Sequence, residues 1–162
     1  MRKPFFCAFF VAAIVMCFGV GADAQTSRRS VSAGEVTGTF NHGFAGKKLK
    51  DITSRIDILA LGKGKLKVVF DLVYPYTLQD ENGEVSANLG ELSGEASIKG
   101  DTAVLESAEF GPCKITIKFV RPGQVKVTQD GTDANCGFGH NVTAAGTYKK
   151  VSSKKPTFDD VQ

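Results

Sequence analysis

Residues 66–74 read Leu-Lys-Val-Val-Phe-Asp-Leu-Val-Tyr, and this stretch decides the fold. An apolar residue stands at every second position, and side chains alternate between the two faces of a β-strand. One face of the expected strand is therefore apolar and the other largely polar. Residues 114–119 repeat the pattern, and no window between residues 34 and 151 sustains apolar residues at helical spacing. The sequence predicts an all-β domain in which each sheet face turned inward forms the core.

Turn-forming residues separate the expected strands at short intervals. Gly62-Lys63-Gly64, Gly100-Asp101 and Arg121-Pro122-Gly123 each stand between two strand-like runs, as in β-hairpins. Residues 75–91, with Asn82-Gly83 as a tight turn, are expected to form a long excursion between strands. The result is about eight antiparallel strands in meander order, over residues 34–41, 52–61, 65–74, 93–99, 102–109, 113–120, 124–129 and 142–150.

The first and last strands have matching apolar faces, Val36, Gly38 and Phe40 on one and Val142, Ala144, Gly146 and Tyr148 on the other. Antiparallel pairing with Phe40 near Val142 would turn both faces inward and set Gly38 opposite Ala144. Such pairing removes the two exposed edges of a meander. We therefore expect a small closed β-barrel, with a two-sheet sandwich as the alternative.

The N-terminus has the pattern of a secretory signal peptide. Arg2 and Lys3 precede an apolar stretch, and Ala22-Asp23-Ala24 forms an A-x-A cleavage site. We expect residues 1–24 to be cleaved, which predicts export to the periplasm or outside the cell without stable membrane insertion afterwards. Residues 25–33 are expected to form a flexible lead-in, 34–151 a single β-barrel domain, and 152–162 a flexible tail.

The charge of the chain argues against nucleic-acid binding. Loss of the leader lowers the formal net charge from +3 to +2, because Arg2, Lys3 and Asp23 leave with it. The remaining Lys residues are interspersed with acids rather than gathered in a basic stripe. Nucleic acid is therefore not an expected partner.

Cys113 and Cys136 are the two cysteines outside the leader. In an oxidising compartment two such cysteines are expected to pair. A disulfide across this span stabilises by about 3 kcal/mol on the chain-entropy estimate. Metal binding and thiol redox chemistry are alternatives, and neither is supported by a C-x-x-C spacing.

Three segments carry a resemblance to known proteins: residues 110–117 around Cys113, residues 129–142 around the Cys-Gly-Phe-Gly sequence, and Gly146-Thr147-Tyr148. They resemble small exported bacterial β-barrel domains, which are similar in plan to lipocalin-like barrels and periplasmic lysozyme inhibitors. The resemblance implies a barrel, and it adds inhibition of a cell-wall hydrolase as an alternative function. Those inhibitors usually carry a late-strand Trp and a Ser-Gly segment before a Tyr. This chain has no Trp, and Ser93-Gly94 precedes Glu95.

Motifs for catalysis and for cofactors are absent from the sequence: there is no nucleophile elbow, no zinc-protease helix motif and no phosphate-binding loop. We expect neither an enzyme nor a cofactor. A hydrolase using the carboxylate pairs Glu106 and Glu109 or Glu91 and Glu95 is an alternative. The expected pairing of the end strands would also bring His42 beside His140, where they would bind a metal with Asp130, Asp133 or Asn41. The ordinary interpretation places both histidines in turns.

The leading prediction is an exported, non-enzymatic binding protein, in one of two versions. In the first version the barrel holds a small apolar ligand, lined by Phe40, Phe70 and Tyr148. In the second version, loops 75–91 and 130–141 contact an envelope protein through the exposed aromatics Tyr74, Tyr76 and Phe138.

Overall fold

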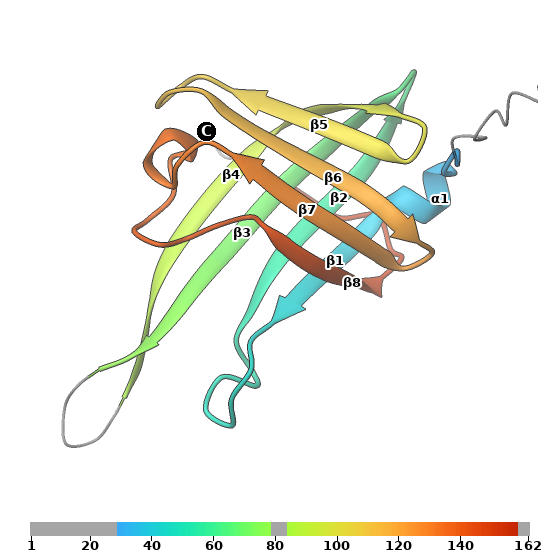
Figure 1. Ribbon diagram of the computed structural model, residues 1–162. Coiled ribbons are helices and arrows are strands. Elements are labelled where there is room, and N and C mark those ends of the chain that lie inside the picture. The colour runs from blue at the N-terminus through green and yellow to red at the C-terminus, as the bar shows by residue number, and fades with distance from the viewer. Residues whose placement is uncertain (1–28, 79–83, 159–162) are drawn as a thin grey trace, which may run out of the picture.

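The computed structural model describes residues 29–78 and 84–158. Eight antiparallel strands follow one another in meander order and close into a barrel, because β1 pairs with both β2 and β8 (Figure 1). The predicted fold class is confirmed, and the structure is not a sandwich. The elements are α1 Ala33–Val36, β1 Gly38–Gly43, β2 Thr53–Gly62, β3 Lys65–Thr77, β4 Val85–Lys99, β5 Thr102–Ser107, β6 Cys113–Arg121, β7 Gln124–Asp130, the 3₁₀ helix η1 Ala134–Cys136 and β8 Gly146–Ser152.

The barrel core follows the alternation in the sequence. Leu66, Val68, Phe70 and Leu72 of β3 are at most 1% exposed, while the residues between them are partly exposed. The ring of Phe40 packs edge-on against Phe119 at 6.3 Å between ring centres. Aromatic and branched side chains from opposite walls therefore meet inside the barrel, which stabilises it by burying apolar surface.

The barrel closes in a different register from the predicted one. Phe40 lies opposite Lys150, and Asn41 lies opposite Lys149. The predicted pairing of Phe40 with Val142, and of Gly38 with Ala144, is wrong. Alternation fixes which side chains share a face, but a shift by an even number of residues preserves those faces. The observed register requires a glycine at position 38. A Cβ on Gly38, at φ +143°, would collide with the carbonyl oxygen of Ser152.

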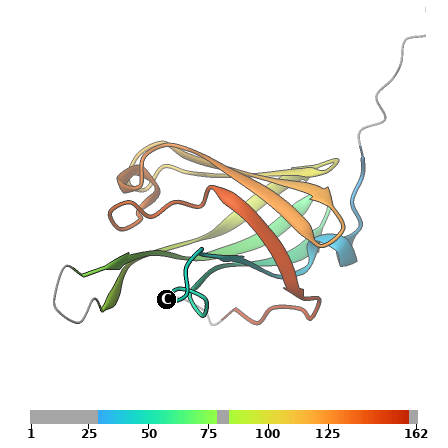
Figure 2. The same ribbon diagram turned by 60° about the horizontal axis from the view of Figure 1, so that its bottom comes forward.

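A helical turn replaces the predicted start of the first strand. Ser32 caps α1 by accepting a hydrogen bond from the backbone N–H of Glu35. At the other end of α1, the Lys150 ammonium donates hydrogen bonds to the carbonyl oxygens of Gly34, Glu35 and Thr37. Burial lowers the pKa of Lys150. The helix covers one end of the barrel, where Val36 is buried (Figure 2).

Residues 75–77 and 85–91 extend β3 and β4 as a long antiparallel ribbon rather than the predicted excursion. The β3–β4 register runs without interruption from Lys65↔Ser97 to Thr77↔Val85. This ribbon projects beyond the end of the barrel that lies opposite α1 (Figure 1). The predicted tight turn at Asn82-Gly83 lies outside the described residues, as does the predicted signal peptide.

The C-terminal segment follows the outside of the barrel. Strand β8 continues to Ser152, two residues beyond its predicted end. The Lys67 ammonium lies 4.9 Å from the centre of the Phe158 ring, on the outer face of β3. The residues up to Phe158 therefore return to the barrel wall.

Candidate functional site

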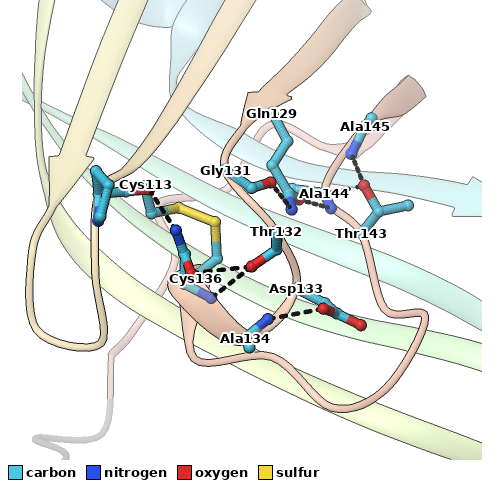
Figure 3. The surroundings of a disulfide bond; sticks show 12 residues. Cys113, Gln129, Gly131, Thr132, Asp133, Ala134, Cys136, Thr143, Ala144 and Ala145 are labelled. Carbon is cyan, nitrogen blue, oxygen red and sulfur yellow. Dashed lines mark hydrogen bonds between the residues drawn. A yellow bond between two sulfur atoms is a disulfide. The ribbon is translucent and has the colours of Figure 1, made fainter.

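The predicted disulfide is present and anchors the segment between β7 and β8 (Figure 3). Cys113 begins β6 and Cys136 ends η1, with their Cα atoms 5.0 Å apart. Both are at most 3% exposed. Asp133 accepts hydrogen bonds from the backbone N–H groups of Ala134 and Asn141, which lower its pKa. The disulfide therefore attaches this hydrogen-bonded segment to the barrel.

Residues 131–145, here called the plug segment, fill the end of the barrel opposite α1. Phe138 and Val142 pack against Gly90 of β4, where an added Cβ would lie 2.9 Å from each side chain. The backbone N–H of Gly139 donates to the carbonyl oxygen of Leu89. Figure 2 shows the plug segment between the two layers of strands. Phe138 is only 7% exposed, so the prediction that it is an exposed contact residue is wrong.

The other candidate aromatics fall into two groups. Phe40, Phe70 and Tyr148 are at most 1% exposed and belong to the core. Burial raises the pKa of the Tyr148 hydroxyl, which donates a hydrogen bond to the carbonyl oxygen of Ala144. Tyr74 and Tyr76 are 39% and 38% exposed. The first group packs the interior, and the second lies on the projecting hairpin.

Tyr74, Tyr76 and Leu78 continue the inward-facing row of β3 beyond the barrel wall. Alternation puts Tyr74 and Tyr76 on the same face as Phe70 and Leu72. Within the barrel this face is buried, but on the ribbon the two tyrosines and Leu78 are 38–39% exposed. We call these three residues the aromatic row. Inside the barrel the opposing wall covers Phe70 and Leu72 on this face. In the described part of the chain, no opposing wall covers the aromatic row on the ribbon.

The two histidines have different surroundings. The Nδ1 atom of His42 lies 2.9 Å from the carbonyl oxygen of Thr147, and its ring contacts Phe44 and Tyr148. His140 Nδ1 lies 4.0 Å from an Asp133 oxygen. The register predicted to bring the histidines together does not occur. Over the described part of the chain, no cluster of three or more His, Cys, Asp or Glu residues is placed to hold a metal ion.

The carboxylates considered for hydrolysis have different neighbours. Glu95 forms an ion pair with Lys65, and Glu106 lies 3.5 Å from the Lys114 ammonium. Glu91 and Glu109 border a depression of about 260 Å³ beside Leu92, Phe110 and Cys136. A second depression, of about 550 Å³, lies beside Cys113 and between Glu106 and Asn135.

Comparisons with known proteins give no relative: no family model, no curated protein and no solved structure matches the chain. Within residues 29–78 and 84–158, no helix has the length and apolar character needed to cross a membrane. Functional inference therefore rests on the residues and their geometry.

Proposed function

We propose that this chain is an exported, non-enzymatic binding protein whose projecting β3–β4 ribbon contacts a protein partner. The observation that supports this proposal is the exposure of the aromatic row. Three large side chains on one face of a two-stranded ribbon provide a contact surface with little conformational entropy to lose. Exposed aromatics contribute disproportionately to the affinity of protein interfaces.

Burial favours this version over a small-ligand cavity. Phe40, Phe70 and Tyr148, which a cavity would need as its lining, are at most 1% exposed. The plug segment closes the end of the barrel through Phe138 and Val142. An export destination fits the disulfide, since disulfides persist in oxidising compartments.

Site-specific photo-crosslinking in the cells that make the protein tests the proposal. A photoreactive phenylalanine analogue replaces Tyr76 in one version, and Lys126, an exposed residue on β7, in the control version. We expect one protein to be crosslinked at position 76 and not at 126. The additional change Tyr74→Ala is expected to weaken that crosslink, because it removes a neighbouring contact on the same face.

Equal crosslinking at positions 76 and 126, or none at 76, would contradict the proposal. An apolar small molecule crosslinked from a core position such as Phe70 would instead support the cavity version. The wild-type unfolding midpoint must be retained in both labelled proteins for the comparison to apply.

A further inference from the structure

Strand β4 has an edge that the barrel leaves largely without a strand partner. In the described residues β5 pairs with β4 only through Ser97↔Val104, Ile98↔Ala103 and Lys99↔Thr102. Beyond these pairs the two strands diverge, as Figure 1 shows. Leu105 covers Gly94, where an added Cβ would lie 3.1 Å from its side chain. On the N-terminal side of Gly94, the β4 edge borders the depression of about 260 Å³ lined by Glu91 and Ser93, and not a strand.

Backbone direction along β4 follows from two hydrogen bonds. The N–H of Ile98 donates to the carbonyl oxygen of Gly64, on the β3 side. The carbonyl oxygen of Leu89 accepts from Gly139, on the opposite side. Backbone groups alternate sides along an antiparallel strand, and the β3–β4 register has no irregularity between these residues. The N–H and C=O groups of Glu91 and Ser93 therefore point away from β3, and both residues line the depression.

The depression combines this edge with an apolar floor. Leu92 and the buried Cys136 line it, and Phe110, which is 64% exposed, borders it. The ring of Phe110 lies along Gly137, where an added Cβ would come within 2.7 Å of it. An extended peptide placed along Glu91–Ser93 would pair with the backbone and place an apolar side chain beside Phe110.

Charge identifies the chemistry of the occupant. Both charged residues that line the depression, Glu91 and Glu109, are acidic. We propose that the β4 edge over Glu91–Ser93 binds an extended segment of another protein, in which a Lys or Arg alternates with apolar residues. This is strand addition, with the backbone supplying affinity and the acidic border selecting a basic segment. The site is separate from the aromatic row and does not require it.

A second copy of this chain fits the same edge less well. Antiparallel pairing of two β4 edges centred on Ser93 sets Glu91 of one copy opposite Glu95 of the other. Like charges directly opposite one another destabilise a strand pair. Self-association is therefore an outcome that the experiment has to detect, not the expected one.

A short peptide of alternating Val and Lys is the probe, added to the full ¹⁵N-labelled chain. We expect shifts and slowed hydrogen exchange at the amides of Glu91 and Ser93. A Val–Glu peptide and a Val–Lys peptide N-methylated at every second residue should bind at least about tenfold more weakly, because the first carries the opposite charge and the second lacks backbone donors. Tyr74→Ala should leave this binding unchanged, which separates it from the function proposed above.

Matched variants locate the contact. Ser93→Pro removes an N–H that points away from β3 and should abolish binding, whereas Ser93→Ala should retain it. Should Ser93→Pro fail to fold, Phe110→Ala and the N-methylated peptide test the same contact. Equal binding of the Val–Glu peptide, or unprotected amides at Glu91 and Ser93 with the Val–Lys peptide, would overturn the proposal. Concentration-dependent protection without peptide, with dimers in sedimentation, would assign the edge to a second copy.

Discussion

Two polar side chains of β8, those of Tyr148 and Lys150, connect the barrel to the segments that cover its ends. The Lys150 ammonium satisfies three carbonyl oxygens at α1, and the Tyr148 hydroxyl satisfies the carbonyl oxygen of Ala144 in the plug segment. Each donor serves carbonyls that have no strand partner, and an unsatisfied buried acceptor costs about 1–3 kcal/mol. The alternation that places Tyr148 inward is visible in the sequence, but its acceptor is not.

Tyr148→Phe is expected to lower the free energy of unfolding at pH 7 by about 1 kcal/mol, since Ala144 loses its donor. The folded-state pKa of Tyr148 is raised above the unfolded value of 10.0. Its contribution to stability is therefore complete below pH 10 and is lost as the pH rises above it. Urea unfolding of both proteins from pH 7 to 11 should show the difference shrinking above pH 10. A difference that stays constant would contradict the assignment.

Gly90→Ala tests the contact between β4 and the plug segment. The added methyl would meet Phe138 and Val142 at 2.9 Å, so we expect a loss of about 1–3 kcal/mol from overpacking. Gly43→Ala is the control, because nothing lies within 4 Å of a Cβ there. Adding Phe138→Leu should recover part of the loss. Equal unfolding midpoints for Gly90→Ala and Gly43→Ala would show that the plug segment does not pack on β4.

Among the elements, the strands were predictable and their ends were not. Alternation and turn residues predict the bounds of β2, β3, β6 and β7 to within a few residues, because each strand has one buried and one solvent-exposed face. Residues 85–92 of β4 escaped prediction because Gly90 is buried under the plug segment and Leu89 is exposed, which obscures the alternation. The predicted strand over 142–150 includes residues 142–145 because Val142 and Ala144 are buried in alternation, but they belong to the plug segment and not to β8.

The plug segment should depend on the disulfide. Replacing Cys113 and Cys136 together with Ala is expected to cost about 3 kcal/mol, because the bond closes a loop over a sequence separation of 23. Hydrogen exchange at the Gly139 amide should accelerate more than at Ile117 in the core, since the plug segment loses its anchor first. An unchanged urea midpoint, or equal acceleration at both amides, would contradict this role.

For the molecule as a whole, both ends of the barrel are covered and the two surfaces proposed to bind partners lie outside the interior. Helix α1 covers one end and the plug segment the other, while the aromatic row and the β4 edge remain exposed. The sequence correctly predicted a closed meander barrel and its disulfide. It could not separate a filled interior from a hollow one, because Phe40, Phe70 and Tyr148 face inward in either case. Only the contacts between distant strands decide that question.

Native mass spectrometry of the protein recovered from the cells that make it tests the filled interior most directly. We expect a mass two hydrogens below that of the reduced chain and no bound small molecule, because core side chains occupy the barrel. A stoichiometric apolar adduct that survives desalting and is released on denaturation would contradict it and assign the barrel to a ligand.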